Sequence, residues 1–283
     1  MTSALASVIY GLIAAVTWGT GDFSGGLATR RTSVIVVLLW SQAIGLTLVT
    51  LLALLLHEPL PTPRDAVFGA AAGVAGLVGL VSLYRAMSVG QMGVVAPVSG
   101  VIAASLPVMA GALTQGLPGA LTLFGFCLAL AAVWLISRTG SKSQRTSAMT
   151  SSIVLALISG LGFGGFLILI AQAQHGAIYW PLAAARVASL SLVAAWAATH
   201  RLIKVPPRDA FLPVVSAGVM DAAGNLFFVL SSQAGRLDIA GVLSSLYPAA
   251  TVMLALTVLR ERLIRSQAFG MVLAILAIPL ISI

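Results

Sequence analysis

Long apolar runs follow one another along almost the whole chain, and this is the feature that most constrains the fold. The runs fall at 4–26, 34–56, 66–88, 93–115, 119–137, 152–173, 178–199, 211–232, 239–259 and 266–283. A helix needs about 20 predominantly apolar residues to cross a hydrocarbon layer about 30 Å thick. The runs therefore predict an all-α integral membrane protein with ten transmembrane helices in a lipid bilayer.

Composition excludes the other broad classes. Hydrophobic residues make up 59% of the chain and charged residues 8%, with a mean hydropathy of +1.08, which excludes a water-soluble domain. Transmembrane β-barrels show segments of alternating polarity of about 10 residues instead. The first run is not expected to be a cleaved signal peptide, because no basic residue precedes it and Asp22 stands where small residues would be required.

Positive charge is concentrated in four of the short breaks between runs. The net charge is +8, but the 15 Lys and Arg residues form no continuous basic face, so nucleic acid is not an expected partner. The basic breaks contain Arg30 and Arg31; Arg138, Lys142 and Arg145; Arg201, Lys204 and Arg208; and Arg260, Arg262 and Arg265. The positive-inside rule predicts that these four loops are cytoplasmic and that both termini lie outside.

The chain repeats itself after about half its length. Pro63-Arg64-Asp65-Ala66 recurs as Pro207-Arg208-Asp209-Ala210, an offset of 144 residues. Similar offsets relate Gly19, Gly21 and Phe23 to Gly162, Gly164 and Phe166, and relate Gly79, Gly90 and Gly125 to Gly224, Gly235 and Gly270. We predict two five-helix halves, 1–140 and 151–283, joined by a basic, Ser/Thr-rich linker at 141–150. Because corresponding loops differ in charge, the halves should be inverted, with the first span superposing on the sixth and the third on the eighth.

Several short stretches resemble EamA-type members of the drug/metabolite transporter superfamily. They are Trp18-Gly-Thr-Gly-Asp22-Phe23, Tyr84-Arg85-Ala86-Met87-Ser88-Val89-Gly90, Ala96-Pro97-Val98-Ser99, Leu246-Tyr247-Pro248, and Arg260-Glu261-Arg262-Leu263 with Gly270. The resemblance implies two inverted repeats, a central cavity lined chiefly by the first, third, fourth, sixth, eighth and ninth spans, and secondary transport that is often export. Many relatives are expected to have both termini inside, so both orientations stay open.

The chain departs from this family between the fourth and fifth spans. Where the family usually carries a Gly-Glu-Arg-like stretch, this chain has Gln115-Gly116-Leu117-Pro118, and only Glu261 matches that position in the second half. The loop at 116–119 is therefore expected to lack a polar or ionic anchor.

Polar side chains at membrane depth are the candidates for a substrate cavity, because an ionisable group there costs at least about 2.5 kcal/mol. Helical spacing places Asp22 on one face with Trp18, and Asp221 on one face with Asn225 and Phe228. Such a surface suits a small solute with an apolar body and a polar handle. The full predicted cavity set is Trp18, Asp22, Tyr84, Arg85, Ser99, Arg186, Asp221, Asn225, Phe228 and Tyr247.

Each of these residues also has a structural interpretation. Asp22 could cap the end of its helix, Asp221 and Arg186 could form a structural salt bridge, and Tyr84 and Tyr247 could anchor at the interface. Gln42 is offset by 144 residues from Arg186, which suits a hydrogen bond between helices equally well.

Prolines and acids suggest how transport could proceed. Pro97, Pro107 and Pro248 are predicted helix bends, because proline removes a backbone donor and frees a carbonyl. Protons are the candidate coupling ion. Under that hypothesis Asp221→Asn, and in parallel Asp22→Asn, should abolish proton-driven accumulation and leave downhill exchange.

No motif points to an enzyme, a cofactor or a metal. His57, His175 and His200 occupy separate loops, Cys127 has no second cysteine, and no phosphate-binding loop occurs, so a gradient must supply the energy. We expect an exporter in the cytoplasmic membrane, as a monomer or homodimer. An importer, a lipid-linked sugar flippase and a non-transporting sensor or partner subunit are the alternatives.

Overall fold

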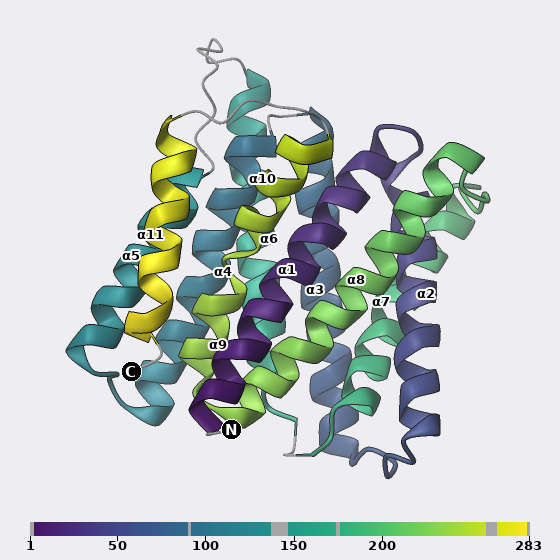
Figure 1. Ribbon diagram of the computed structural model, residues 1–283. Helices are drawn as coiled ribbons and strands as arrows, with labels where there is room; N and C mark the ends of the chain where they lie inside the picture. Colours follow the sequence, from purple (N-terminus) through teal and green to yellow (C-terminus); the bar gives the residue numbers. More distant parts are fainter. Residues whose placement is uncertain (1–2, 90–91, 137–146, 174–175, 259–264, 282–283) are drawn as a thin grey trace.

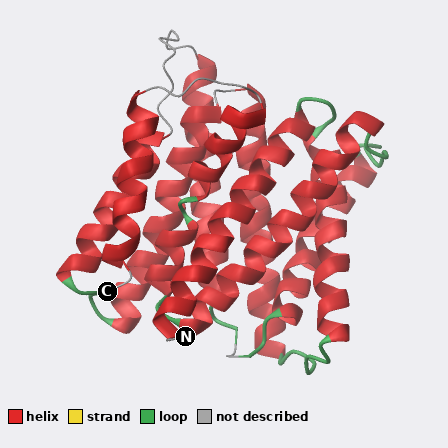
Figure 2. Ribbon diagram, viewed as in Figure 1, coloured by secondary structure: helices red, strands yellow, loops and turns green. Residues whose placement is uncertain are grey.

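The computed structural model describes residues 3–89, 92–136, 147–173, 176–258 and 265–281. These residues form helices joined by short loops and contain no strand (Figures 1 and 2). The helices are α1 (Ser3–Thr29), α2 (Val34–Leu55), α3 (Pro63–Val89), α4 (Met92–Gln115), α5 (Ala120–Ile136), α6 (Ser147–Ile170), α7 (Tyr179–Thr199), α8 (Arg208–Ala234), α9 (Leu237–Ser244), α10 (Tyr247–Val258) and α11 (Arg265–Ile281). Each predicted run corresponds to one helix, except that α9 and α10 share the run at 239–259.

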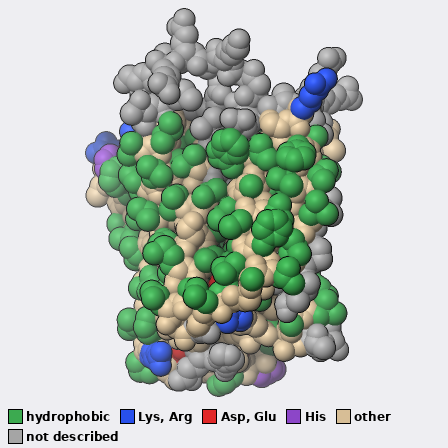
Figure 3. Space-filling view, turned by 90° about the vertical axis from the view of Figure 1, so that its left-hand side faces the viewer, with side chains coloured by type: hydrophobic (Ala, Val, Ile, Leu, Met, Phe, Trp, Pro, Cys, Tyr) green, Lys and Arg blue, Asp and Glu red, His purple; other side chains and the backbone are tan. Residues whose placement is uncertain are grey.

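The apolar character of the helices matches a membrane fold. Six of them, α1, α2, α3, α6, α7 and α8, are long and apolar enough to cross a bilayer, and α4 and α5 contain shorter apolar stretches. Large apolar side chains on α5 and α11, such as Phe124, Phe269 and Leu276, are exposed. A broad apolar surface on this side of the molecule is visible in Figure 3.

The two halves pack as inverted repeats. In Figure 1, α1 rises from the end that carries both termini, whereas α6 runs from the opposite end toward it. Helix contacts between the halves come in corresponding pairs: the two most extensive are α1 with α8 and α6 with α3, and α2 with α8 corresponds to α7 with α3. Exchanging α1 for α6, α2 for α7 and α3 for α8 converts one contact into its counterpart. This arrangement confirms the predicted all-α fold with two inverted five-helix repeats.

Repeat-related glycines lie where helices approach most closely. A Cβ added at Gly162 of α6 would lie 2.5 Å from the backbone nitrogen of Gly79 in α3. A Cβ at Gly19 of α1 would collide with the backbone of α10 at Tyr247. Small residues at such crossings let helix backbones pack tightly in a bilayer, so the offsets seen in the sequence reflect packing that both halves share.

The ninth predicted span is broken rather than continuous. Residues Ser245 and Leu246 separate α9 from α10, immediately before Tyr247-Pro248. Pro248 therefore stands in the first turn of α10, where a helix has no use for the missing N–H. Pro107 lies within α4 and packs against Gly241 of α9. The side chain of Pro97 lies outside the described residues, and bends at Pro97 and Pro107 stay predictions.

Loops at the end that carries the termini tie the halves together. The Glu58 carboxylate accepts hydrogen bonds from the backbone N–H groups of Ile178, Tyr179 and Trp180 at 2.7–3.1 Å and so caps the start of α7. Arg236 Nη2 donates to the Gly116 carbonyl at 2.7 Å. The expectation that the loop at 116–119 lacks a polar anchor is therefore wrong: the anchor comes from the other half of the chain. Glu261 lies outside the described residues, as do residues 141–146 of the predicted linker, whose last four residues belong to α6.

The two basic loops that the structure describes lie at one end of the molecule, which makes the orientation testable. The loops at 30–33 and 200–207 lie at the end opposite the termini (Figure 1). In a Cys127→Ser background, Thr32→Cys and Ile203→Cys should be shielded from a membrane-impermeant thiol reagent in intact cells. Leu60→Cys, in the loop at the terminal end, should be labelled. The reverse labelling pattern would contradict the charge-based orientation and leave the helix packing unaffected.

Candidate functional site

A central cavity lies between the two halves. It is lined by side chains from α1, α2, α3, α4, α6, α7 and α8 and from the break between α9 and α10, and it encloses about 710 Å³ of empty space, including its open mouth. Six of the ten predicted cavity residues line it: Trp18, Asp22, Arg186, Asp221, Asn225 and Tyr247. The surrounding helices are those that pack across the interface between the repeats.

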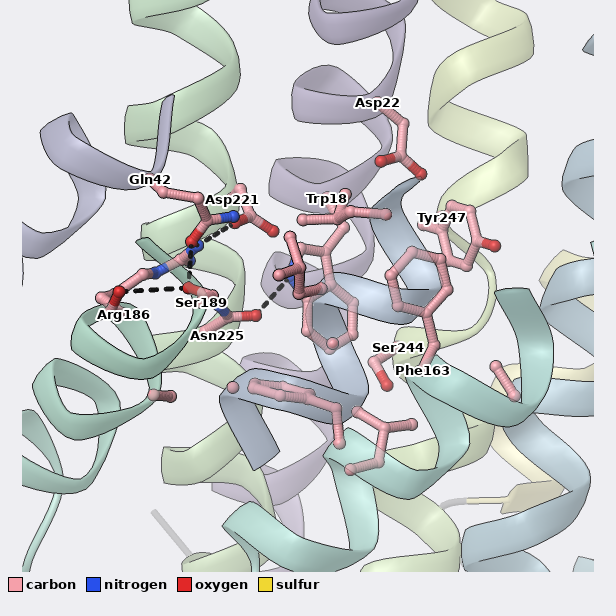
Figure 4. A pocket seen from close by; sticks show the side chains of 18 of the residues that line it. Trp18, Asp22, Gln42, Phe163, Arg186, Ser189, Asp221, Asn225, Ser244 and Tyr247 are labelled. Carbon is pink, nitrogen blue, oxygen red and sulfur yellow. Dashed lines mark hydrogen bonds and ion pairs between the residues drawn. The ribbon is translucent and has the colours of Figure 1, made fainter. Parts of the chain in front are cut away.

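A buried ionic network forms one side of the cavity. Arg186 Nη1 lies 2.6 Å from Asp221 Oδ2 and donates to Gln42 Oε1 at 2.7 Å. The Ser189 hydroxyl donates to the same Gln42 oxygen at 2.9 Å. The network joins α2, α7 and α8 (Figure 4). Both structural interpretations from the sequence, the salt bridge of Arg186 with Asp221 and its hydrogen bond with Gln42, describe contacts that the structure contains.

Trp18 is held in one position by three contacts. Its Nε1 donates to Asn225 Oδ1 at 2.9 Å, and its ring stacks on Phe228 with 5.8 Å between centroids. The ring also packs against Gly224, where any side chain would collide with it. The indole is thus fixed across the α1–α8 interface before any solute enters.

Asp22 lies one helical turn beyond Trp18 on α1. Figure 4 shows it near Tyr247, on the side of Trp18 away from the Arg186 network. It forms no hydrogen bond or ion pair with any residue that the structure describes. It does not cap the end of its helix, because α1 continues to Thr29.

The opposite wall of the cavity is apolar. It contains Gly76, Leu77 and Leu80 of α3 and Phe163, Phe166 and Leu167 of α6. Helices α3 and α6 are the repeat counterparts of α8 and α1. At an offset of 145 residues, Gly76 of the first repeat corresponds to Asp221 of the second, and Leu80 corresponds to Asn225. The backbone is therefore symmetric, whereas the polarity of the cavity is not.

Sequence reasoning missed two serines in the part of the site formed by the broken span. Ser244 and Ser245 line the cavity together with Tyr247. Their hydroxyls donate back to the carbonyls of Gly241 and Val242 at 3.2 and 2.7 Å, which satisfies acceptors at the end of α9. Discontinuous helices are a common way to build solute sites at the centre of a bilayer. The feature of the sequence that could have indicated this part of the site is the pair Ser244-Ser245 shortly before Tyr247-Pro248.

The structure keeps four predicted cavity residues away from the cavity lining. Tyr84 is buried with its hydroxyl against Gly25 of α1, and Arg85 is exposed. Ser99 is fully buried and hydrogen-bonds to Ser159 at 2.8 Å, joining α4 to α6. Phe228 is also fully buried, behind the Trp18 ring. Three of these side chains hold helices together, and Arg85 points outward.

Comparison with known proteins agrees with this architecture. The sequence profile of the EamA-like transporter family matches residues 5–138 and again residues 150–283. The chain belongs to the EamA-like transporter family. It is thus a multi-pass membrane transporter of the drug/metabolite type, with a small-molecule substrate.

Solved structures support the fold of this EamA-like chain. One, described as "Crystal structure of protein", superposes with a TM-score of 0.79 over 98% of both chains at 16% sequence identity. No curated protein matches the sequence. At this identity the likeness shows the fold alone, so the chemistry of the EamA-like site rests on its own side chains.

The ionic network predicts a specific pattern of stability. Asp221→Asn leaves the Arg186 charge buried without its carboxylate, which should cost about 3 kcal/mol. The double variant Arg186→Gln/Asp221→Asn removes both charges and should recover most of the loss. Thermal unfolding of the purified protein in detergent ranks the variants.

Asp209→Asn is the matched control for this series. Asp209 pairs with Arg31 at 4.0 Å, and its side chain is 65% exposed, so its loss should change stability by less than about 0.5 kcal/mol. If Asp221→Asn and the double variant Arg186→Gln/Asp221→Asn have the same stability, the ion pair does not hold α7 to α8.

Proposed function

We propose that the protein is a secondary transporter of the cytoplasmic membrane that exports a small solute with an apolar body and a polar handle. The observation that carries the proposal is the central cavity between inverted halves, with a polar wall on α1, α2, α7 and α8 and an apolar wall on α3 and α6. A solute with both characters can satisfy both walls at once. A purely polar solute would leave the aromatic and aliphatic wall without a partner.

The inverted repeat supports alternating access as the mechanism. Because each half packs in the same way against the other, either face can in principle open around a fixed central site. Contacts between the halves close the two ends. Arg236 and Gly116 meet at the terminal end, and Arg31 pairs with Asp209 at the basic end. Transport requires these ties to separate in turn.

The energy source follows from what the sequence lacks. The chain has no phosphate-binding loop, so we propose that a proton, ion or solute gradient drives the cycle. The assignment of Asp221 as the proton carrier stays a prediction, and its ion pair with Arg186 makes it the less available of the two cavity acids. Because both halves of one chain line the cavity, we propose that a monomer transports.

The test is transport into vesicles that contain only the purified protein. A counterflow screen of amino acids, nucleosides, vitamins and cationic drugs, with and without an imposed pH or sodium gradient, should find accumulation of one solute class. The sign of the gradient that drives accumulation separates export from import. Movement of a lipid-linked sugar would favour the flippase, and absence of any movement would favour the non-transporting alternatives.

The cavity predicts which hydrogen bond between α1 and α8 matters for transport. Asn225→Ala removes the acceptor that holds the Trp18 indole, a loss of about 1 kcal/mol, and should raise the solute concentration for half-maximal transport about fivefold. Initial rates of counterflow measure this.

Ser216→Ala provides the matched control. It also removes a hydrogen bond between α1 and α8, that of Ser216 with Ser24 at 2.9 Å, but neither serine lines the cavity. This variant should transport with the affinity of the wild type. If both variants behave alike, the effect of Asn225 comes from helix packing, and the indole is not part of the solute site.

A further inference from the structure

The charges that line the cavity do not cancel. Asp22, Arg186 and Asp221 are its ionisable acids and bases, and no lysine, histidine or second arginine joins them among the described lining residues. Arg186 and Asp221 neutralise each other across 2.6 Å. With Asp22 ionised, the cavity therefore carries one uncompensated negative charge.

Asp22 has no cationic partner among the residues that the structure describes. Asp221, which lines the same cavity, has the same sign of charge, and no described side chain forms a hydrogen bond or ion pair with Asp22. A lone carboxylate at membrane depth is costly and is seldom kept without a use. A positively charged solute would supply the missing countercharge.

An ordered aromatic ring lies beside this carboxylate. Trp18 precedes Asp22 by one turn on the same face of α1, and both line the cavity. Its N–H is already taken by Asn225, and Phe228 fixes its orientation. Indole is the aromatic side chain that attracts cations most strongly. Carboxylate and indole together form a site suited to an organic cation.

Arg186 does not offer a competing site for an anion. Its side chain is 6% exposed, its Nη1 is shared by Asp221 and Gln42, and its Nε and Cζ pack against Gly45 of α2. Its Nη2 has no hydrogen-bond partner, but this atom is fully buried. An anion would have to displace Asp221 to reach the guanidinium.

We propose that the transported solute is a monovalent organic cation with an aromatic or otherwise apolar body. Its charged centre lies at Asp22 beside Trp18, and its body lies against Leu77, Leu80 and Phe163. This inference rests on the proposed transport function and adds the charge and the binding site of the substrate. Neutralisation of Asp22 by the solute favours cations over anions of the same shape.

Two ions of matched shape and opposite charge test the proposal. Equilibrium binding of radiolabelled tetraphenylphosphonium and tetraphenylborate is measured on the purified protein in nanodiscs, with empty nanodiscs subtracted. The wild type should bind the phosphonium at least about tenfold more tightly than the borate. Asp22→Asn should weaken phosphonium binding about tenfold without weakening borate binding, whereas Asp22→Glu should retain most of the preference.

Asp209→Asn controls for the loss of one negative charge outside the cavity and should leave both affinities unchanged. Equal affinity of the wild type for the two ions would overturn the proposal, as would wild-type phosphonium binding by Asp22→Asn. If Asp22→Asn does not fold, the wild-type preference and the Asp22→Glu variant still decide between the two outcomes.

In the vesicle screen, transport of neutral or anionic solutes alone would refute the cation inference and leave the transport function standing. Transport of no solute class would refute the proposed function itself.

Discussion

The ion pair between Arg186 and Asp221 solves the central physical problem of this protein, which is how to keep charge inside a bilayer. Each charge alone would be costly at that depth. Paired at 2.6 Å, and with Gln42 accepting a further hydrogen bond from Arg186, they hold α7, α8 and α2 together. The pair also gives the cavity one polar side, and its neutrality leaves Asp22 as the group that sets the charge of the site.

The symmetry of the backbone and the asymmetry of the side chains have different functions. Gly79 and Gly224 correspond in the two repeats, and each receives an aromatic ring: Phe163 in one half and Trp18 in the other. The same close packing is thus used twice. The cavity residues themselves differ, since Gly76 stands where the second half has Asp221. Equivalent packing permits two related conformations, whereas unlike walls let a solute bind in one orientation.

Local patterns predicted the spans and the repeat, because apolar runs and constant offsets are properties of the sequence alone. They could not place side chains whose environment comes from distant segments. Phe228 shares a helical face with Asp221 and Asn225, yet it packs behind Trp18, because that face is wide enough to border both a neighbour and the cavity. Pro248 indicated a bend, but the full break between α9 and α10 was hidden within a continuous apolar run. The contact of Arg236 with Gly116 joins residues far apart in the chain.

The ties that close the two ends of the molecule differ in burial, and this difference bears on the direction of transport. At the terminal end, Arg236 donates to the Gly116 carbonyl of the other half while paired with the fully buried Asp238, and Glu58 caps α7 through charge-assisted hydrogen bonds. At the basic end, Arg31 and Asp209 are 4.0 Å apart and both exposed, a kind of pair that contributes little to stability. Of these ties between the halves, the ion pair at the basic end is therefore the weakest, which supports the proposal that this end opens. If the positive-inside rule holds for this chain, that end faces the cytoplasm, and a solute would enter the cavity from the cytoplasmic side, as export requires.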